Sequence, residues 1–341
     1  MVFKAIHSDL MDVRDDGFGM HDAHSPKTIS PRRSRKPASE LIRHALDRTE
    51  EVFDRLGAYS YLTTLDKSDF FYYRSFYLDS LHEIDEKIVQ GRLVPVDLSD
   101  FPQVVRFPGY EINAALFIGS FDPFQMTHLA TALRYLASSA TSSPVVFVVP
   151  EGHDNPSKPR KSDYRHRYEL LEMQVLGVFD PLIVPLDIGE GADTIEIVRR
   201  FIAMFPGARV SMTHLLGSDV FPIAASWLPI DMKAWRDEAE KRRVDFSYRA
   251  FVVRRDGCPM DEKDIDTVKV LDLPIHVDDK PIGAPSSTDF RENRAFSIVF
   301  PTESVIRHVE VLFRYNLNKP WNVCSLDDAP PKATRSRKNT T

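Results

Sequence analysis

Residues 119–128 hold the side chains of this chain that are best placed to do chemistry: a Gly-Ser-Phe-Asp-Pro turn leads to Gln125 and His128. An apolar run at 114–118 precedes the turn, and a helical pattern that begins at Leu129 follows it. This order predicts a strand, a tight turn and a helix N-terminus, where backbone N–H groups and the helix dipole favour an anion such as phosphate. Gln125 and His128 stand three positions apart, so they face the same side of the first helical turn.

A second segment with phosphate-binding chemistry lies far downstream, at Ser286, Ser287, Thr288 and Arg291. Its hydroxyls and the backbone N–H groups that follow suit phosphate oxygens, and the arginine supplies a cation. Strings of this kind also occur as ordinary helix caps. The position of this one, after a glycine turn in a pattern of alternating strands and helices, favours the phosphate interpretation.

Together, the two segments resemble the nucleotidyltransferase superfamily, whose members carry a (His/Thr)-x-Gly-His turn and a Ser-Ser-Thr-x-x-Arg turn. Within it, the chain is most similar to the nicotinate/nicotinamide mononucleotide adenylyltransferases. Gln125 stands where the two-histidine form of the motif has its first histidine, and Thr127 stands at the glycine. His128 matches the motif unchanged.

Further partial matches to this family follow in chain order. Each is a residue for which the resemblance implies contact with the mononucleotide: Lys158, Arg167, Thr194, Asp219 and Trp227. Lys158 would neutralise a substrate phosphate, and Trp227 would stack on the pyridine ring. Local alternatives stay open, since Lys158 lies in a basic run that water could solvate and Trp227 could belong to the core.

The resemblance implies adenylyl transfer from ATP, with Mg²⁺, to nicotinate or nicotinamide mononucleotide, giving a pyridine dinucleotide of NAD biosynthesis and pyrophosphate. The attacking phosphate is already anionic, so the reaction needs alignment and charge neutralisation and no general base. The candidate catalytic residues are therefore His128, Arg291 and Lys158. The candidate residues for ATP and its phosphates are Gly119, Ser120, Phe121, Gln125, His128, Ser286, Ser287, Thr288 and Arg291.

Asp122 is interpreted as a cap of the turn and of the helix that follows.

Two alternatives to this enzyme remain open. One is a related nucleotidyltransferase that acts on another phosphorylated substrate. The other is a catalytically weakened nucleotide-binding or scaffolding protein, which the residues at Gln125 and Thr127 favour and the retained His128 and Arg291 oppose.

The composition is that of a soluble globular protein, with 43% hydrophobic and 28% charged residues, which supplies ample material for a core. A net charge of -6 gives no general attraction to nucleic acid. No apolar run approaches the roughly 20 residues that a membrane span needs. Cys258 and Cys324 lack zinc spacing, so we expect a cytoplasmic, reducing location and no metal held by the protein.

The chain is predicted to contain four parts: a disordered tail at 1–37, a helical extension at 38–105, the nucleotidyltransferase domain at 106–325 and a basic disordered tail at 326–341. A basic cluster at 30–37 is best interpreted as part of a solvated tail. Its alternatives are a phosphate-binding arm and a localisation signal, which would make the location nuclear.

From residue 112 onward, strands and helices alternate with short connections, closing with a helix at 304–313. This pattern predicts an α/β fold, a doubly wound, mostly parallel, Rossmann-like sheet with right-handed crossovers. In such sheets ligands bind beyond the carboxyl ends of the strands. The glycine turn after the first strand lies at that edge.

The helical extension is predicted to hold two helices, the first ending at Gly57 and the second running from an N-cap at Ser68 to a C-cap at Gly91. The second helix opens with a dense run of aromatic residues at 70–77. We expect it to be clamped between the first helix and the catalytic domain, because so short a pair cannot bury these rings alone. The alternative is a surface for a partner or for a homo-oligomer.

Overall fold

The computed structural model describes residues 38–57, 64–95, 111–141, 143–153, 161–258 and 260–283. The predictions for the two tails, for Lys158, for the phosphate segment at 286–291 and for the helix at 304–313 fall outside these ranges. No helix in the described part of the chain is both long and apolar enough to cross a membrane.

The described residues form one six-stranded sheet in the order β3-β2-β1-β4-β5-β6. Every neighbouring pair of strands is parallel. This is the doubly wound order, with a reversal of winding between β1 and β4, and it confirms the predicted fold class. The strands are β1 (Glu111–Gly119), β2 (Val146–Pro150), β3 (Ile183–Pro185), β4 (Arg209–Gly217), β5 (Asp245–Arg255) and β6 (Ile275–Ile282).

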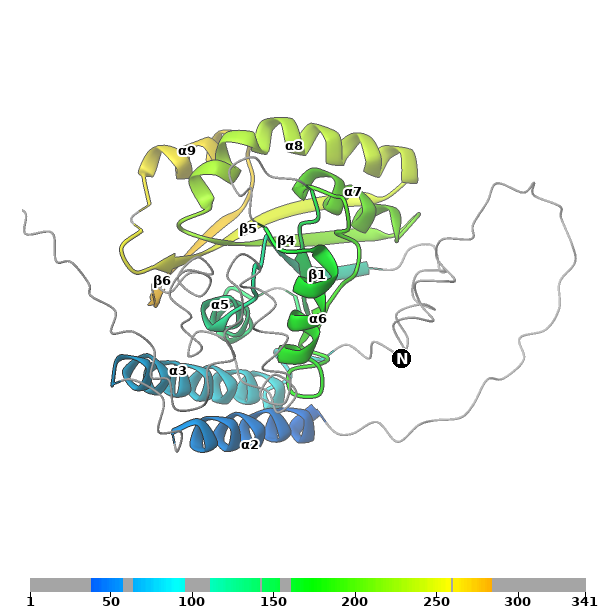
Figure 1. Ribbon diagram of the computed structural model, residues 1–341. Helices are drawn as coiled ribbons and strands as arrows, with labels where there is room; N and C mark the ends of the chain where they lie inside the picture. Colours follow the sequence, from blue (N-terminus) through cyan, green and yellow to red (C-terminus); the bar gives the residue numbers. More distant parts are fainter. Residues whose placement is uncertain are drawn as a thin grey trace, which may run out of the picture.

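Helices cover both faces of the sheet, which explains why its strands are apolar on both sides (Figure 1). On one face lie α5 (Met126–Ala137) and α6 (Tyr164–Val175), and on the other α7 (Thr194–Ala203), α8 (Phe221–Arg242) and α9 (Glu262–Val270). Within β1, Ala115 and Phe117 belong to the core shared with α5, whereas Leu116 and Ile118 belong to the core shared with α7 and α8.

Two further helices, α2 (Ala38–Gly57) and α3 (Thr64–Val89), form an outer layer against α5 (Figure 1). The predicted end of α2 at Gly57 is confirmed. Gly91 closes α3 as predicted: its φ is +66°, and the Arg92 N–H donates to the Lys87 carbonyl at 2.8 Å. The predicted start at Ser68 is wrong, because no glycine or proline stops the helix from extending back to Thr64.

The clamped position predicted for α3 is confirmed, and polar contacts reinforce it. The Tyr77 hydroxyl donates to the carbonyl of Met126 at 2.8 Å, at the start of α5. The Lys87 ammonium group donates to the carbonyls of Leu136 at 2.6 Å and Ser138 at 2.7 Å, at the end of α5. The extension therefore holds both ends of the helix that carries His128.

Helix α8 begins at Phe221, whereas the sequence pattern predicts a helix only over 231–242. Pro222 lies in its first turn, where a missing N–H costs nothing, and Pro229 lies inside it. The interior proline is tolerated because the flanking Leu228 and Met232 bury the inner face of the helix against the sheet. Helix α9 has no counterpart in the sequence prediction, since Val268 is its only buried residue and its apolar periodicity is weak.

Candidate active site

The candidate site lies where the winding of the sheet reverses, between the carboxyl ends of β1 and β4. Phe117 pairs with Leu215 across these strands, so the glycines that end them, Gly119 and Gly217, lie at the same edge of the sheet. The turn that leads into α5 and the turn that leads into α8 therefore leave the same edge of the sheet. Open α/β sheets bind their ligands in the crevice at this reversal.

The turn after β1 packs aromatic rings around His128. Phe121 adopts a φ of +40°, and its ring lies 3.1 Å from the place where a Cβ on Gly119 would stand. The ring of His128 lies 4.9 Å from that of Phe121, 5.5 Å from Phe124 and 6.0 Å from Phe117, centroid to centroid. Three phenylalanine rings thus fix the plane of the half-buried imidazole.

The helix cap of α5 determines which nitrogen of His128 can act as a donor. Gln125 is the N-cap, and its backbone N–H donates to His128 Nδ1 at 3.1 Å. We infer from this contact that Nδ1 is the acceptor of the neutral imidazole and that Nε2 carries the hydrogen. His128 can therefore offer an Nε2–H group to an oxyanion.

The side chain of Gln125 is buried in the same cap. Its Oε1 accepts a hydrogen bond from the Thr127 N–H at 2.8 Å, and its Nε2 donates to Thr127 Oγ1. The branched side chain of Thr127, only 1% exposed, is thus folded into the cap. The Gln125 amide oxygen thus accepts from the Thr127 N–H, one of the backbone N–H groups at the start of α5 that the sequence predicts to face a phosphate.

The interpretation of Asp122 as a helix cap is wrong, because Gln125 fills that role. Asp122 precedes the N-cap by three residues, too far to reach the first free N–H groups of α5. Its Oδ2 instead accepts a hydrogen bond from the Ser162 N–H at 3.1 Å, which joins the turn after β1 to the start of α6.

Arg167 ties three segments of the site together. Its buried guanidinium donates to the carbonyls of Ser120, of Ser162 at 3.0 Å and of Glu151 at 2.8 Å. These carbonyls belong to the turn after β1, the approach to α6 and the end of β2. The three carbonyl oxygens therefore point at the guanidinium of Arg167, and these hydrogen bonds fix the shape of the phosphate-facing turn.

Thr194 and Trp227 lie on the two helices that flank the crevice on the opposite face. Thr194 opens α7, where Asp193 caps the helix, and its hydroxyl donates to Glu151 Oε1 at 2.6 Å. Trp227 is 56% exposed, so the alternative that it belongs to the core is wrong. The core tryptophan of α8 is Trp235.

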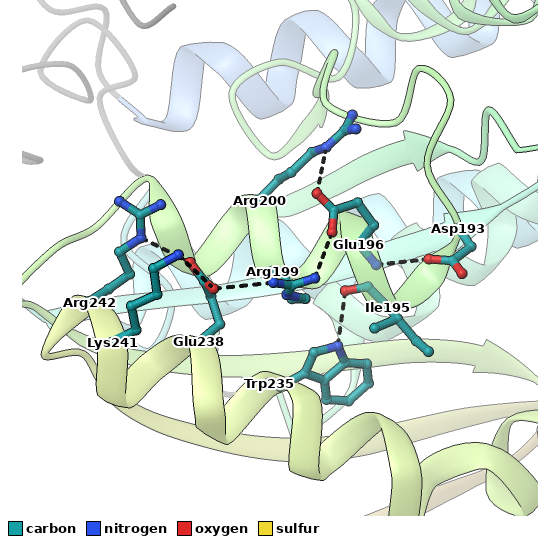
Figure 2. Close-up of polar contacts among 9 residues, drawn as sticks. All are labelled: Asp193, Ile195, Glu196, Arg199, Arg200, Trp235, Glu238, Lys241 and Arg242. Carbon is teal, nitrogen blue, oxygen red and sulfur yellow. Dashed lines mark hydrogen bonds and ion pairs between the residues drawn. The ribbon is translucent and has the colours of Figure 1, made fainter. Parts of the chain in front are cut away.

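Contacts between α7 and α8 set the relative position of these two candidate residues. Figure 2 shows the indole of Trp235 donating to the carbonyl of Ile195, at 3.2 Å. Beside it, Glu238 of α8 receives Arg242 at 2.9 Å and Arg199 of α7 at 3.5 Å (Figure 2). The first turn of α7 is thus fixed against the middle of α8, two turns from Trp227.

Asp219 follows β4 and forms an ion pair with Arg255, the last residue of β5. Sequence reasoning missed this arginine. The available signal was its position, since a basic residue that ends an apolar parallel strand lies at the ligand-binding edge of the sheet.

A buried polar group near the first turn of α7 was also missed. Burial, and then the charge of Asp193, raise the pKa of Asp231 from its ordinary value of 3.8 to about 6. Burial lowers the pKa of His214 to about 4, and its Nδ1 lies 3.2 Å from the hydroxyl of Tyr248. The Tyr248 ring stacks on Trp235. Asp231, His214 and Tyr248 are thus ionisable side chains that lie between α8 and the sheet.

Comparisons with known proteins find chains similar to this one among solved structures. No family model and no curated protein matches the chain. It is similar to Plasmodium falciparum nicotinic acid mononucleotide adenylyltransferase complexed with NaAD, with 17% identity and a TM-score of 0.41 over 60% of this chain and 97% of that one. The same enzyme complexed with APC gives 17% identity and a TM-score of 0.39 over 60% and 96%. Similarity at this level assigns no substrate.

Proposed function

We propose that the chain transfers the adenylyl group of ATP to nicotinate or nicotinamide mononucleotide, forming a pyridine dinucleotide and releasing pyrophosphate. The observation that carries the proposal is the position of His128, whose Nδ1 accepts the Gln125 N–H. This residue lies after a glycine turn, at the N-terminus of α5, where the winding of the sheet reverses. This is the position at which doubly wound folds bind nucleotide phosphates.

The chemistry asks for donors and cations and for no side-chain nucleophile. An oxygen of the mononucleotide phosphate attacks the α-phosphorus of ATP, and the bond from that phosphorus to the bridging oxygen of the β-phosphate breaks. His128 donates Nε2–H to an α-phosphate oxygen as charge develops there, and the dipole of α5 adds to the stabilisation. In this proposal, Lys158 neutralises the attacking phosphate.

The remaining roles follow the same logic of charge neutralisation. The hydroxyls of Ser286, Ser287 and Thr288 and the guanidinium of Arg291 hold the β- and γ-phosphates as they leave. Trp227 offers an exposed flat ring for the pyridine. Thr194 offers a hydroxyl at the start of α7, and Asp219 offers a carboxylate in the turn after β4.

Mg²⁺ enters this reaction bound to ATP. Across the described ranges, no cluster of three or more His, Cys, Asp or Glu side chains could hold a metal ion. Mg²⁺ that is bound to a nucleotide takes its ligands mainly from phosphate oxygens and water. The ion supplies further neutralisation of charge on the leaving group.

A second candidate function is nucleotide binding with weak or no turnover. The observation that favours it is the cap of α5, in which the Gln125 amide already occupies the N–H of Thr127. An incoming phosphate would have to displace this side chain to reach that N–H group. A third candidate is adenylyl transfer to another phosphorylated substrate.

Pyrophosphate release separates these functions. Purified protein is incubated with ATP and Mg²⁺, alone and with each of the two mononucleotides. The proposal predicts pyrophosphate only when a mononucleotide is present. Binding of ATP without pyrophosphate from either mixture would support the weakened protein. Release with a different phosphorylated substrate, and with neither pyridine mononucleotide, would support the third candidate.

A further inference from the structure

A carboxylate and a guanidinium group meet on the β4 side of the crevice. Asp219 lies two residues beyond β4 and Arg255 ends β5, so the parallel pairing of these strands brings them together. The Nη1 group of Arg255 donates to Asp219 Oδ2. The side chain of Arg255 is 13% exposed and that of Asp219 is 30% exposed, so a ligand in the crevice can reach the carboxylate.

The backbone around this pair is shaped to hold it. A Cβ on Gly217 would stand 2.4 Å from Asp219 Oδ1 and 3.2 Å from Cδ of Arg255, so a larger residue there would displace the Asp219 carboxylate from its present position. Ser218 fastens the two strand ends together. Its N–H donates to the Val253 carbonyl at 2.9 Å, and its Oγ accepts from the Arg255 N–H at 2.9 Å.

A lone carboxylate at this position would be poorly suited to a reaction between two phosphorylated nucleotides. Its oxygens can accept hydrogen bonds from uncharged hydroxyls, but its charge repels phosphate groups. A guanidinium bonded to the carboxylate offsets that repulsion and also fixes the direction in which the free lone pairs point.

We propose that Arg255 is a positioning residue, which neutralises and orients Asp219 so that this carboxylate accepts hydrogen bonds from the ribose hydroxyls of the mononucleotide. The inference rests on the proposed function, because it assigns the ribose of that substrate to the same site. The two residues are expected to act as a single unit.

The neighbouring arginine provides a matched control. Arg254 pairs with Asp279 at 3.2 Å, and these side chains are 51% and 83% exposed. Exposed pairs of this kind contribute little to stability and are strongly screened by salt. Arg254→Gln removes the same charge from the same strand end, so it separates a general charge effect from the role of Arg255.

Titration calorimetry measures the binding of nicotinate mononucleotide and of nicotinamide mononucleotide, each on its own. The proteins are the wild type, Arg255→Gln, Asp219→Asn, the double variant and Arg254→Gln, and circular dichroism confirms that each is folded. We expect Arg255→Gln to weaken binding about 10-fold or more, in line with the loss of a charge-assisted contact, and Arg254→Gln to leave binding unchanged. The double variant should bind no worse than the single variant that has the lower affinity, because either single substitution already breaks the Asp219–Arg255 pair.

Salt and a conservative substitution separate this role from a merely structural one. The deficit of Arg255→Gln should shrink as NaCl is raised, because it comes from repulsion between Asp219 and the phosphate. Arg255→Lys should restore part of the affinity, since it keeps the charge without the fork. Equal binding by Arg255→Gln and Arg254→Gln, or additive losses in the double variant, would overturn the inference alone. A wild type that binds no mononucleotide would overturn the proposed function with it.

Discussion

The buried carboxyl of Asp231 should make stability depend on pH in a direction opposite to that of most acidic residues. Its side chain is buried, and among the described residues its Oδ1 has no hydrogen-bond partner. The charged form is therefore poorly solvated, and Asp193 repels it further. Replacement by asparagine removes the charge and keeps the shape.

The magnitude follows from the two pKa values. A carboxyl whose pKa is raised in the folded state binds its proton more tightly there, so its contribution is complete below 3.8 and is lost as pH rises through 6. A shift from 3.8 to about 6 corresponds to a full effect of about 3 kcal/mol, of which about 1.4 kcal/mol develops between pH 5 and pH 8. The wild type should lose this amount over that interval relative to Asp231→Asn.

Urea unfolding at pH 5 and pH 8 measures the difference. The constant cost of the asparagine amide cancels when the two pH values are compared. Asp237→Asn is the control, because Asp237 is an exposed residue of the same helix that pairs with Lys233 at 2.7 Å. If Asp231→Asn and the wild type change in parallel between the two pH values, the raised pKa and its assignment to burial are wrong.

Three further predictions concern the site and its support. His128→Ala should lower the rate of adenylyl transfer by about 10² or more while the protein remains folded, and a near wild-type rate would reject the role of Nε2–H. Nicotinamide mononucleotide should quench tryptophan fluorescence, and Trp227→Phe should abolish the quench; a quench that persists would reject stacking on the pyridine. Lys87→Met should lower the free energy of unfolding by about 1–3 kcal/mol, because two buried carbonyls of α5 lose their donor. Unchanged stability in urea would contradict that role.

The sequence was sufficient for the sheet because its signals are local. Short apolar runs such as 114–118, each followed by a turn and a helical pattern, are typical of parallel strands buried on both faces. The position of the glycine turn at the binding edge follows from that topology. The boundaries were less predictable: Pro229 lies inside α8, where burial of the inner face offsets a lost hydrogen bond.

The details of the site depended on contacts that no local pattern encodes. The cap formed by Gln125 and Thr127 is a side-chain geometry, and the sequence alone could identify these residues only as departures from a motif. Arg255 meets Asp219 because β5 lies beside β4, a pairing between residues far apart in the chain. The raised pKa of Asp231 likewise arises from tertiary burial.

The fate of the α-phosphorus of ATP distinguishes adenylyl transfer from nucleotide binding alone. The protein is incubated with Mg²⁺, nicotinate or nicotinamide mononucleotide, and ATP labelled at either the α- or the γ-phosphorus, with His128→Ala in parallel. We expect the α-label to appear in a pyridine dinucleotide and the γ-label to appear only in pyrophosphate, and we expect His128→Ala to lose both signals. Absence of α-label from any dinucleotide, in a protein that binds both substrates, would contradict adenylyl transfer.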